Sequence, residues 1–267
     1  MNPPRLEQYE VLIRIPTGTA KPTPLLFVHG AYAAAWCWEE HFLPFFAEAG
    51  YAACAVSLSG HGGSPGRKHL DSFSIADYVR DVAAVADSLP APPVLVGHSM
   101  GGFVVQKYLE DHVAPGAVLM CAVPPQGIMS AALGMMFSKP GMMSELNSLM
   151  SGGKASLETL REALFAQPVS PDDLLRYYKH TQAESHRAIW DMSLFGMPRV
   201  GRVKRTPLLV QGAEFDHLMP ASLVEMTART YGVAANIFPG MGHGLMLERD
   251  WEMPAQQILD WLEELQL

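Results

Sequence analysis

The feature that most restricts the fold of this chain is a five-residue turn between two apolar segments, Gly97-His98-Ser99-Met100-Gly101. Residues 92–96 before the turn predict a short buried strand, and residues 102–109 after it have the apolar spacing of a helix. A strand that turns directly into a helix holds the central Ser99 in strained dihedrals, with its side chain clear of the backbone. Glycines at both ends of the turn would let the two elements approach closely. The pattern is that of a nucleophile elbow, which exposes a hydroxyl at the carboxyl edge of a sheet.

Strand-like and helix-like segments alternate along most of the 267 residues. Predicted strands cover residues 10–15, 25–29, 52–58, 94–97, 117–122, 207–211 and 235–238. Predicted helices cover residues 38–49, 74–89, 102–112, 222–231 and 254–265. Strands that alternate with helices favour a mostly parallel sheet with helices on both faces. The sequence therefore predicts an α/β fold, and it is long enough for a large core.

The alternation stops between about residues 124 and 202, where no strand is predicted. Helices are expected over 156–167, 171–180 and 186–195, and Ser170 followed by Pro171 is typical of a helix start. This region also contains a cluster of methionines, namely Met129, Met135, Met136, Met142, Met143 and Met150. Methionines of this kind either fill a core or form an apolar surface that adapts to a ligand. We expect a helical cap over 124–202, inserted into an α/β core formed by 1–123 and 203–267.

The composition limits the partners and the location of the protein. The net charge is −8, and the only basic cluster is the short stretch 199–205, so no surface for a nucleic acid backbone is expected. The first residues lack the apolar stretch of a secretory signal, and no window is long and apolar enough to span a bilayer. A cytoplasmic location is the expectation. The odd number of cysteines (Cys37, Cys54 and Cys121) favours buried free thiols over disulfides.

A serine hydroxyl is a weak nucleophile until a base takes its proton, so Ser99 requires a histidine that a carboxylate orients. Of the ten histidines, His243 lies in the glycine-rich loop 239–244, directly after the last predicted strand. Loops at strand ends are where an α/β sheet gathers its functional groups. His98 adjoins the elbow, but the alternation of a strand points its side chain away from Ser99. His243 is therefore the predicted base.

Two carboxylates follow the predicted strand 207–211 and are candidates for the third member of the triad. Asp216 is favoured, because the loop needs a few residues to reach the base, and Glu214 is the alternative. The segment that ends the predicted strand 117–122 contains no carboxylate, which removes the other usual position.

An oxyanion that forms during acyl transfer needs N–H donors. One predicted donor is the backbone N–H of Met100, the residue after the nucleophile. The other is the N–H of Ala31, in the loop His29-Gly30-Ala31-Tyr32 after the predicted strand 25–29. Glycine at position 30 allows the tight turn that would direct this N–H toward the serine.

Five segments together resemble the α/β-hydrolase superfamily over nearly the whole chain. They are Phe27-Val28-His29-Gly30, Ser59-Gly60-His61-Gly62-Gly63-Ser64, Gly97-His98-Ser99-Met100-Gly101-Gly102, residues 212–216, and Gly242-His243-Gly244. The chain order Ser99, Asp216, His243 is the order of the triad in that family. The segment Ala35-Trp36-Cys37-Trp38 is similar to small esterases and methylesterases related to plant hydroxynitrile lyases. Ser57 replaces the aspartate of many relatives, and Gly244 replaces the lysine of cyanide-releasing lyases, which disfavours cyanide release.

The resemblance implies a serine hydrolase that cleaves carboxylic esters through an acyl-enzyme, with no metal or organic cofactor. The expected small-molecule substrate is an ester with an apolar acyl or aromatic group. Its candidate contacts are Tyr32, Trp36, Met136, Phe137, Trp190 and His217, although the aromatic ones could instead pack the cap on the core. Ser99 disfavours dehalogenases and epoxide hydrolases, which attack with a carboxylate. Other reactions stay open (C–C bond or enol-lactone hydrolysis, thioester hydrolysis, perhydrolysis), as do a non-hydrolytic ligand sensor and the oligomeric state.

Overall fold

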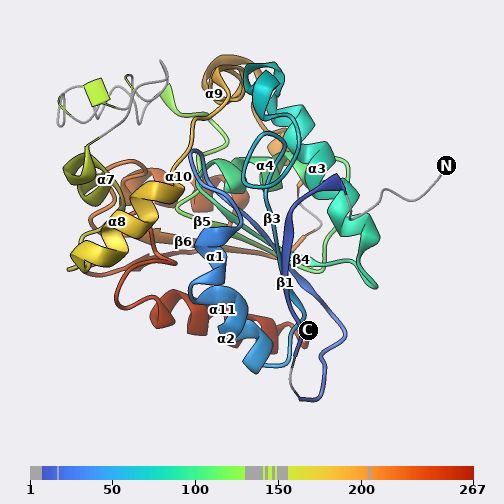
Figure 1. Ribbon diagram of the computed structural model, residues 1–267. Coiled ribbons are helices and arrows are strands. Elements are labelled where there is room, and N and C mark those ends of the chain that lie inside the picture. Colours follow the sequence, from blue (N-terminus) through green and yellow to red (C-terminus); the bar gives the residue numbers. More distant parts are fainter. Residues whose placement is uncertain are drawn as a thin grey trace.

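The structure, a computed structural model, describes residues 8–16, 18–129, 141, 144, 145, 148, 156–203 and 206–267. Its centre is a seven-stranded sheet in the order β1-β3-β2-β4-β5-β6-β7 (Figure 1). The strands are β1 (Val11–Arg14), β2 (Leu25–Val28), β3 (Ala53–Val56), β4 (Val94–His98), β5 (Ala117–Met120), β6 (Leu208–Ala213) and β7 (Ala235–Phe238). β1 pairs with β3 in antiparallel orientation, and every other pair is parallel. The predicted mostly parallel α/β sheet is confirmed.

Helices cover both faces of the sheet because its strands are apolar on both faces. In β2, Leu26 and Val28 belong to one buried cluster, and Leu25 and Phe27 belong to the other. The first cluster is covered by α3 (Ile75–Ser88), α4 (Met100–Tyr108) and α10 (Ala221–Tyr231). The second is covered by α1 (Trp36–Glu39), α2 (Phe42–Glu48) and α11 (Glu252–Glu264). All three cysteines are free and buried, as expected.

One predicted helix differs from the observed elements. The segment 38–49 forms two helices, α1 and α2, that are separated at His41, whose φ of −139° is not helical. The His41 ring stacks on Trp251, which leads into α11, with the ring centroids 4.7 Å apart. This tertiary contact holds His41 outside the helical conformation, which apolar periodicity alone could not reveal.

Between β5 and β6 the described residues contain helices and no strand. They include α7 (Leu157–Leu164), α8 (Pro171–His180), α9 (His186–Trp190), the π-helix η3 (Asp191–Phe195) and the 3₁₀ turn η4 (Val200–Arg202). The predicted helix 186–195 is thus α9 continued by η3. Ser170 begins α8 by accepting the N–H of Asp173 at 3.1 Å, as predicted for this position. Figure 1 shows α7 beside α8, and α9 close to the segment that leads into α3. The cap boundaries at 124 and 202 remain predictions.

Several predicted features lie outside the described residues, namely Met135, Met136, Met142, Met143, Met150 and Phe137. Within the described part of the chain, no helix combines the length and the apolar character needed to cross a bilayer.

Candidate active site

Ser99 occupies a strained turn between β4 and α4. Its φ and ψ are 52° and −116°, and positive φ is costly for a residue with a side chain. The strain is held by two backbone hydrogen bonds: the Ser99 N–H donates to Met120 at 3.0 Å, and the Ser99 carbonyl accepts from Val123 at 3.1 Å. A Cβ on Gly97 would lie only 2.5 Å from the carbonyl oxygen of Gly101, so only glycine fits there. The half-buried serine thus has the geometry of a nucleophile elbow.

Asp216 and His243 form a buried hydrogen-bonded pair at the carboxyl edge of the sheet. Asp216 follows β6, His243 follows β7, and Asp216 Oδ2 lies 2.7 Å from His243 Nδ1. Asp216 Oδ1 accepts the backbone N–H groups of Leu218 at 2.8 Å and Met219 at 2.7 Å, which fix the carboxylate. An ionised carboxylate only accepts, so the proton lies on Nδ1 and the lone pair of Nε2 is free. The alternative Glu214 is exposed, and its carboxylate accepts the N–H of Gly240 at 2.9 Å.

The loop that carries His243 is held by Glu248, a buried carboxylate that the sequence analysis did not single out. Glu248 Oε1 accepts the backbone N–H groups of Gly242 and of Ala166, both at 2.7 Å. Burial raises the pKa of Glu248, while the backbone hydrogen bonds oppose that rise. The N–H of Gly244 donates to Leu164, the last residue of α7, at 2.7 Å. The position of the imidazole therefore depends on both the core and the segment between β5 and β6.

The side chain of His98 contacts His243. Strand alternation predicts only that this side chain points away from Ser99. The two ring centroids lie 4.6 Å apart, and His98 Nε2 donates to the carbonyl oxygen of His243 at 2.9 Å. Burial and the neighbouring His243 hold the pKa of His98 well below its usual value, so this ring stays neutral. The sequence analysis gave His98 no role, and only the folded register brings it against the predicted base.

Cys121 lies beside the Asp216–His243 pair. It occupies the start of the segment after β5, where the sequence contains no carboxylate for the triad. It follows β5 with φ of 44° and is fully buried. Its sulfur, an Asp216 carboxylate oxygen and a His243 ring nitrogen all lie within 4.8 Å of one another. Among the described residues, these three have spacing that could hold a metal ion. Burial, the Asp216 charge and a hydrogen bond to Asp216 raise the pKa of the thiol well above its usual value. Metal ions bind the thiolate form of cysteine, and this thiol is protonated. Cys121 is therefore better suited to donate a hydrogen bond to Asp216 than to bind a metal ion.

Both predicted oxyanion donors lie next to the elbow. A Cβ placed on Gly30 would lie 3.1 Å from Ser99 Cβ, so the loop that contains Ala31 borders the nucleophile directly. Met100 is the first residue of α4, and the first N–H groups of a helix have no partner within it. The N-terminal end of a helix also favours negative charge. The Met100 N–H and the loop that contains Ala31 thus both lie beside Ser99, and their role as oxyanion donors stays a prediction.

The predicted substrate contacts lie in different surroundings. Trp36 stacks on Tyr177 of α8 with the ring centroids 5.7 Å apart, so it packs the inserted segment on the core. Trp190 is 57% exposed at the end of α9. His217 lines a hollow of about 270 Å³ that also includes Phe165 and Phe215.

Tyr32, another of these predicted contacts, follows Ala31 in the loop beside Ser99. Burial and the Glu184 carboxylate raise the pKa of its phenol well above the usual value, so it stays neutral. Met136 and Phe137 lie outside the described residues. A role in substrate binding stays a prediction for all six positions.

Comparisons with known proteins agree with this architecture. A monoacylglycerol lipase from Mycolicibacterium smegmatis is 26% identical over 255 residues, which cover 89% of this chain and 87% of that protein. A non-heme chloroperoxidase from Burkholderia pyrrocinia is 33% identical over 114 residues, which cover 40% of each protein, so the match spans less than half of that relative. The solved structure of the esterase EaEST from Exiguobacterium antarcticum has a TM-score of 0.72 at 18% identity, covering 97% of this chain and 98% of that one.

The model of the alpha/beta hydrolase family matches residues 25–260, which include the elbow, the Asp216–His243 pair and the loop that contains Ala31. The resemblance inferred from the sequence motifs is confirmed. The chain belongs to the alpha/beta hydrolase family.

Proposed function

We propose that the protein is a serine hydrolase that cleaves carboxylic esters, with Ser99, His243 and Asp216 as its triad. The observation that carries the proposal is the buried hydrogen bond of 2.7 Å between Asp216 Oδ2 and His243 Nδ1. It fixes the tautomer in which Nε2 can accept a proton, as a general base requires. The strained elbow of Ser99 at the same edge of the sheet supplies the nucleophile.

In the proposed reaction, Ser99 Oγ attacks the ester carbonyl carbon and its proton passes to His243 Nε2. The carbonyl oxygen becomes an oxyanion that accepts hydrogen bonds from the N–H groups of Ala31 and Met100. When the intermediate collapses, the ester C–O bond breaks and the alkoxide leaves with the proton from His243. Water then attacks the acyl-enzyme, gives its proton to the same imidazole, and releases the acid and free Ser99. Asp216 stabilises the imidazolium in both half-reactions.

The proposed substrate carries an apolar acyl or aromatic group. The monoacylglycerol lipase relative supports an ester with an apolar chain. Phe165 of the inserted segment lines the hollow beside His217 and gives it an apolar wall. The chloroperoxidase relative favours one second candidate, perhydrolysis, in which hydrogen peroxide instead of water attacks the acyl-enzyme and yields a peracid.

The test is the hydrolysis of p-nitrophenyl esters of graded chain length by the wild-type protein and by Ser99→Ala. We expect turnover by the wild type and a loss of about 10⁴-fold or more in Ser99→Ala, with the circular dichroism spectrum unchanged. Adding hydrogen peroxide to the same assay, with detection of the peracid, measures the perhydrolase alternative. No turnover of any ester by the wild type would contradict the proposal and favour a ligand-binding protein.

A further inference from the structure

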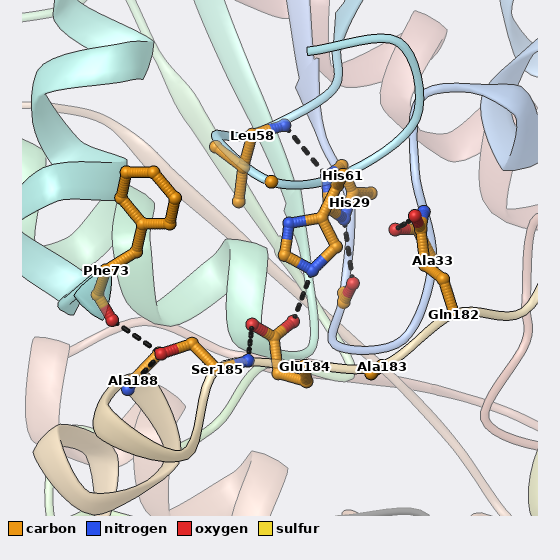
Figure 2. Close-up of polar contacts among 12 residues, drawn as sticks. His29, Ala33, Leu58, His61, Phe73, Gln182, Ala183, Glu184, Ser185 and Ala188 are labelled. Carbon is orange, nitrogen blue, oxygen red and sulfur yellow. Dashed lines mark hydrogen bonds and ion pairs between the residues drawn. The ribbon is translucent and has the colours of Figure 1, made fainter. Parts of the chain in front are cut away.

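A second buried carboxylate–histidine pair, Glu184 with His61, joins the segment between α8 and α9 to the core (Figure 2). Glu184 Oε2 lies 3.0 Å from His61 Nε2, and both side chains are fully buried. Glu184 Oε1 accepts the backbone N–H of Ser185 and the hydroxyl of Tyr78, each at 2.7 Å. Burial alone would raise the pKa of Glu184, but the His61 charge and these hydrogen bonds lower it below the usual value. Glu184 is therefore an ionised carboxylate.

The ring of His61 faces an acceptor at each of its two nitrogens. Its Nδ1 lies 3.1 Å from the carbonyl oxygen of Ser59, and its Nε2 faces Glu184. Removing His61 would leave the Glu184 carboxylate buried without this partner, which is strongly destabilising. The pair therefore anchors residues 182–184 on the turn 58–62.

Gln182 extends from this anchor to the loop that contains the predicted oxyanion donor (Figure 2). Its backbone N–H donates to the Tyr32 carbonyl at 3.0 Å, and its side-chain Nε2 donates to the Ala33 carbonyl at 2.9 Å. On the other side, its Oε1 accepts the backbone N–H of Gly62 at 3.2 Å. Gln182 thus holds two successive carbonyl groups of the loop 30–33 against the anchored turn.

The loop 30–33 has a strained conformation that needs such support. Tyr32 has φ of 65°, in the left-handed region that is strained for a residue other than glycine. At the start of the loop, His29 Nδ1 donates to the Gly30 carbonyl at 2.8 Å, and His29 Nε2 accepts the Leu58 N–H at 3.0 Å. Burial lowers the pKa of His29 to about 3, so its ring stays neutral. The loop is therefore held at its start by His29 and along its length by Gln182.

We propose that Gln182 is a positioning residue for the oxyanion hole, and that the buried Glu184–His61 pair holds Gln182 in place. The inference rests on the proposed esterase function, because it needs the Ala31 N–H to bind the oxyanion. Gln182 contacts no reacting atom. Its bonds to the Tyr32 and Ala33 carbonyls fix the 32–33 and 33–34 peptide planes, while His29 holds the Gly30 carbonyl, whose peptide plane carries the Ala31 N–H. Docking of residues 182–184 therefore fixes the end of the loop whose start carries this donor.

The test compares Gln182→Glu with Ser185→Ala, a matched control three residues further along. Gln182→Glu keeps the side-chain length and the acceptor for the Gly62 N–H and for Arg67 Nη1, which donates to Oε1 at 3.0 Å, but loses the donor to the Ala33 carbonyl. Ser185→Ala removes a hydroxyl that donates to the Phe73 carbonyl at 2.6 Å and accepts the Ala188 N–H at the start of α9 at 3.2 Å. It makes no change to the bonds of the loop 30–33. Glu184→Gln serves as a second variant, because its amide keeps the shape of the carboxylate and removes the charge.

The measurements are kcat and KM for a p-nitrophenyl ester, and Ki for phenylboronic acid, with concentrations normalised by active-site titration. We expect kcat of Gln182→Glu to fall about 10–100-fold, with KM changing less than about threefold. The Ki should rise by a similar factor, because the tetrahedral boronate places an oxygen where the oxyanion forms. Glu184→Gln should reduce kcat in the same way by a smaller factor, while Ser185→Ala should stay within about twofold of the wild type.

Each other outcome has a definite meaning. An active wild type with an unchanged kcat in both Gln182→Glu and Glu184→Gln would overturn the inference and leave the esterase proposal intact. A raised KM with unchanged kcat would also overturn it, because Gln182 would then act in substrate binding. If kcat fell equally in Gln182→Glu and Ser185→Ala, the inference would also be overturned, because Gln182 would then only help to dock the segment on the core. A wild type without ester turnover would overturn the esterase proposal, and this inference with it.

Discussion

The described part of the chain contains two buried carboxylate–histidine pairs that differ in what the second ring nitrogen faces. In the Asp216–His243 pair, the carboxylate is hydrogen-bonded to Nδ1, which leaves Nε2 as the nitrogen that can accept a proton. In the Glu184–His61 pair the carboxylate takes Nε2, and the other nitrogen faces a carbonyl oxygen. The first ring therefore keeps one nitrogen for the proton transfer that we propose, whereas both nitrogens of the second ring face protein acceptors.

The comparison shows that burial next to a carboxylate does not by itself identify a catalytic histidine. What distinguishes the two pairs is the number of acceptors around the ring and the position in the fold. His243 lies after a strand at the carboxyl edge of the sheet, beside the elbow, while His61 lies under the segment that joins α8 and α9. One pair is suited to proton transfer, and the other to holding two parts of the chain together.

The largest expected effect comes from neutralising the carboxylate of the first pair. Asp216→Asn should reduce kcat by about 10³–10⁴-fold, because an amide can donate to Nδ1 and favour the wrong tautomer, an effect known from the serine protease triad. The measurement is steady-state hydrolysis of a p-nitrophenyl ester. The matched control is Glu214→Gln, which changes the exposed carboxylate of the same loop and should stay within about twofold of the wild type. A loss in Glu214→Gln as large as that in Asp216→Asn would contradict the assignment.

The second pair should dominate stability. His61→Ala leaves the Glu184 carboxylate buried without a counter-charge and should lower the free energy of unfolding by about 3–5 kcal/mol. The control is His186→Ala, which breaks the exposed His186–Asp71 pair of 2.7 Å. That exposed pair should contribute about 0–1 kcal/mol. Urea denaturation at pH 7 measures both variants, and similar losses would show that the buried pair is no more stabilising than a surface one.

The stability of the wild type should also depend on pH through Glu184. Its pKa is lowered in the folded state relative to the ordinary value of 4.5, so the unfolded chain binds the proton more readily. The stabilisation is complete above the unfolded pKa and is lost as the pH falls through the folded pKa. Glu184→Gln should therefore show a flatter decline in the free energy of unfolding between about pH 5 and pH 3. Identical slopes in the two proteins would refute this origin of the acid sensitivity.

The smallest expected effect tests the thiol beside the first pair. Cys121→Ala removes the donor to Asp216 and should reduce kcat about threefold, in line with one neutral hydrogen bond. Cys121→Ser keeps a donor and should retain activity closer to that of the wild type. If the alanine variant is as active as the serine variant, the thiol only fills space.

The sheet and the elbow could be predicted because their signals are local. The apolar runs mark the strands, and glycines around Ser99 mark the turn. The proximity of Asp216 and His243 followed from the rule that functional groups gather at strand ends. His61 and Glu184 could not be paired in this way, because nothing in their local sequence shows that the segment after α8 returns to the turn 58–62. The same holds for the contact of His98 with His243, which depends on how β4 sits against the loop after β7.

The break between α1 and α2 has a similar cause. The apolar spacing of residues 38–49 is continuous, and the stacking of His41 on Trp251 joins positions that are far apart along the chain. Such contacts appear only once the helices are packed on the sheet. Sequence patterns therefore located the elements and the predicted triad, while the residues that support the triad came from the tertiary structure.

The most direct test of the triad is intact-mass analysis of the protein after brief exposure to a fluorophosphonate. The wild type should gain one adduct, peptide mapping should place it on Ser99, and His243→Ala should react at least about 10³-fold more slowly. An adduct on another residue would contradict the proposed chemistry. So would a wild-type protein that does not react, or a His243→Ala variant that reacts as fast as the wild type.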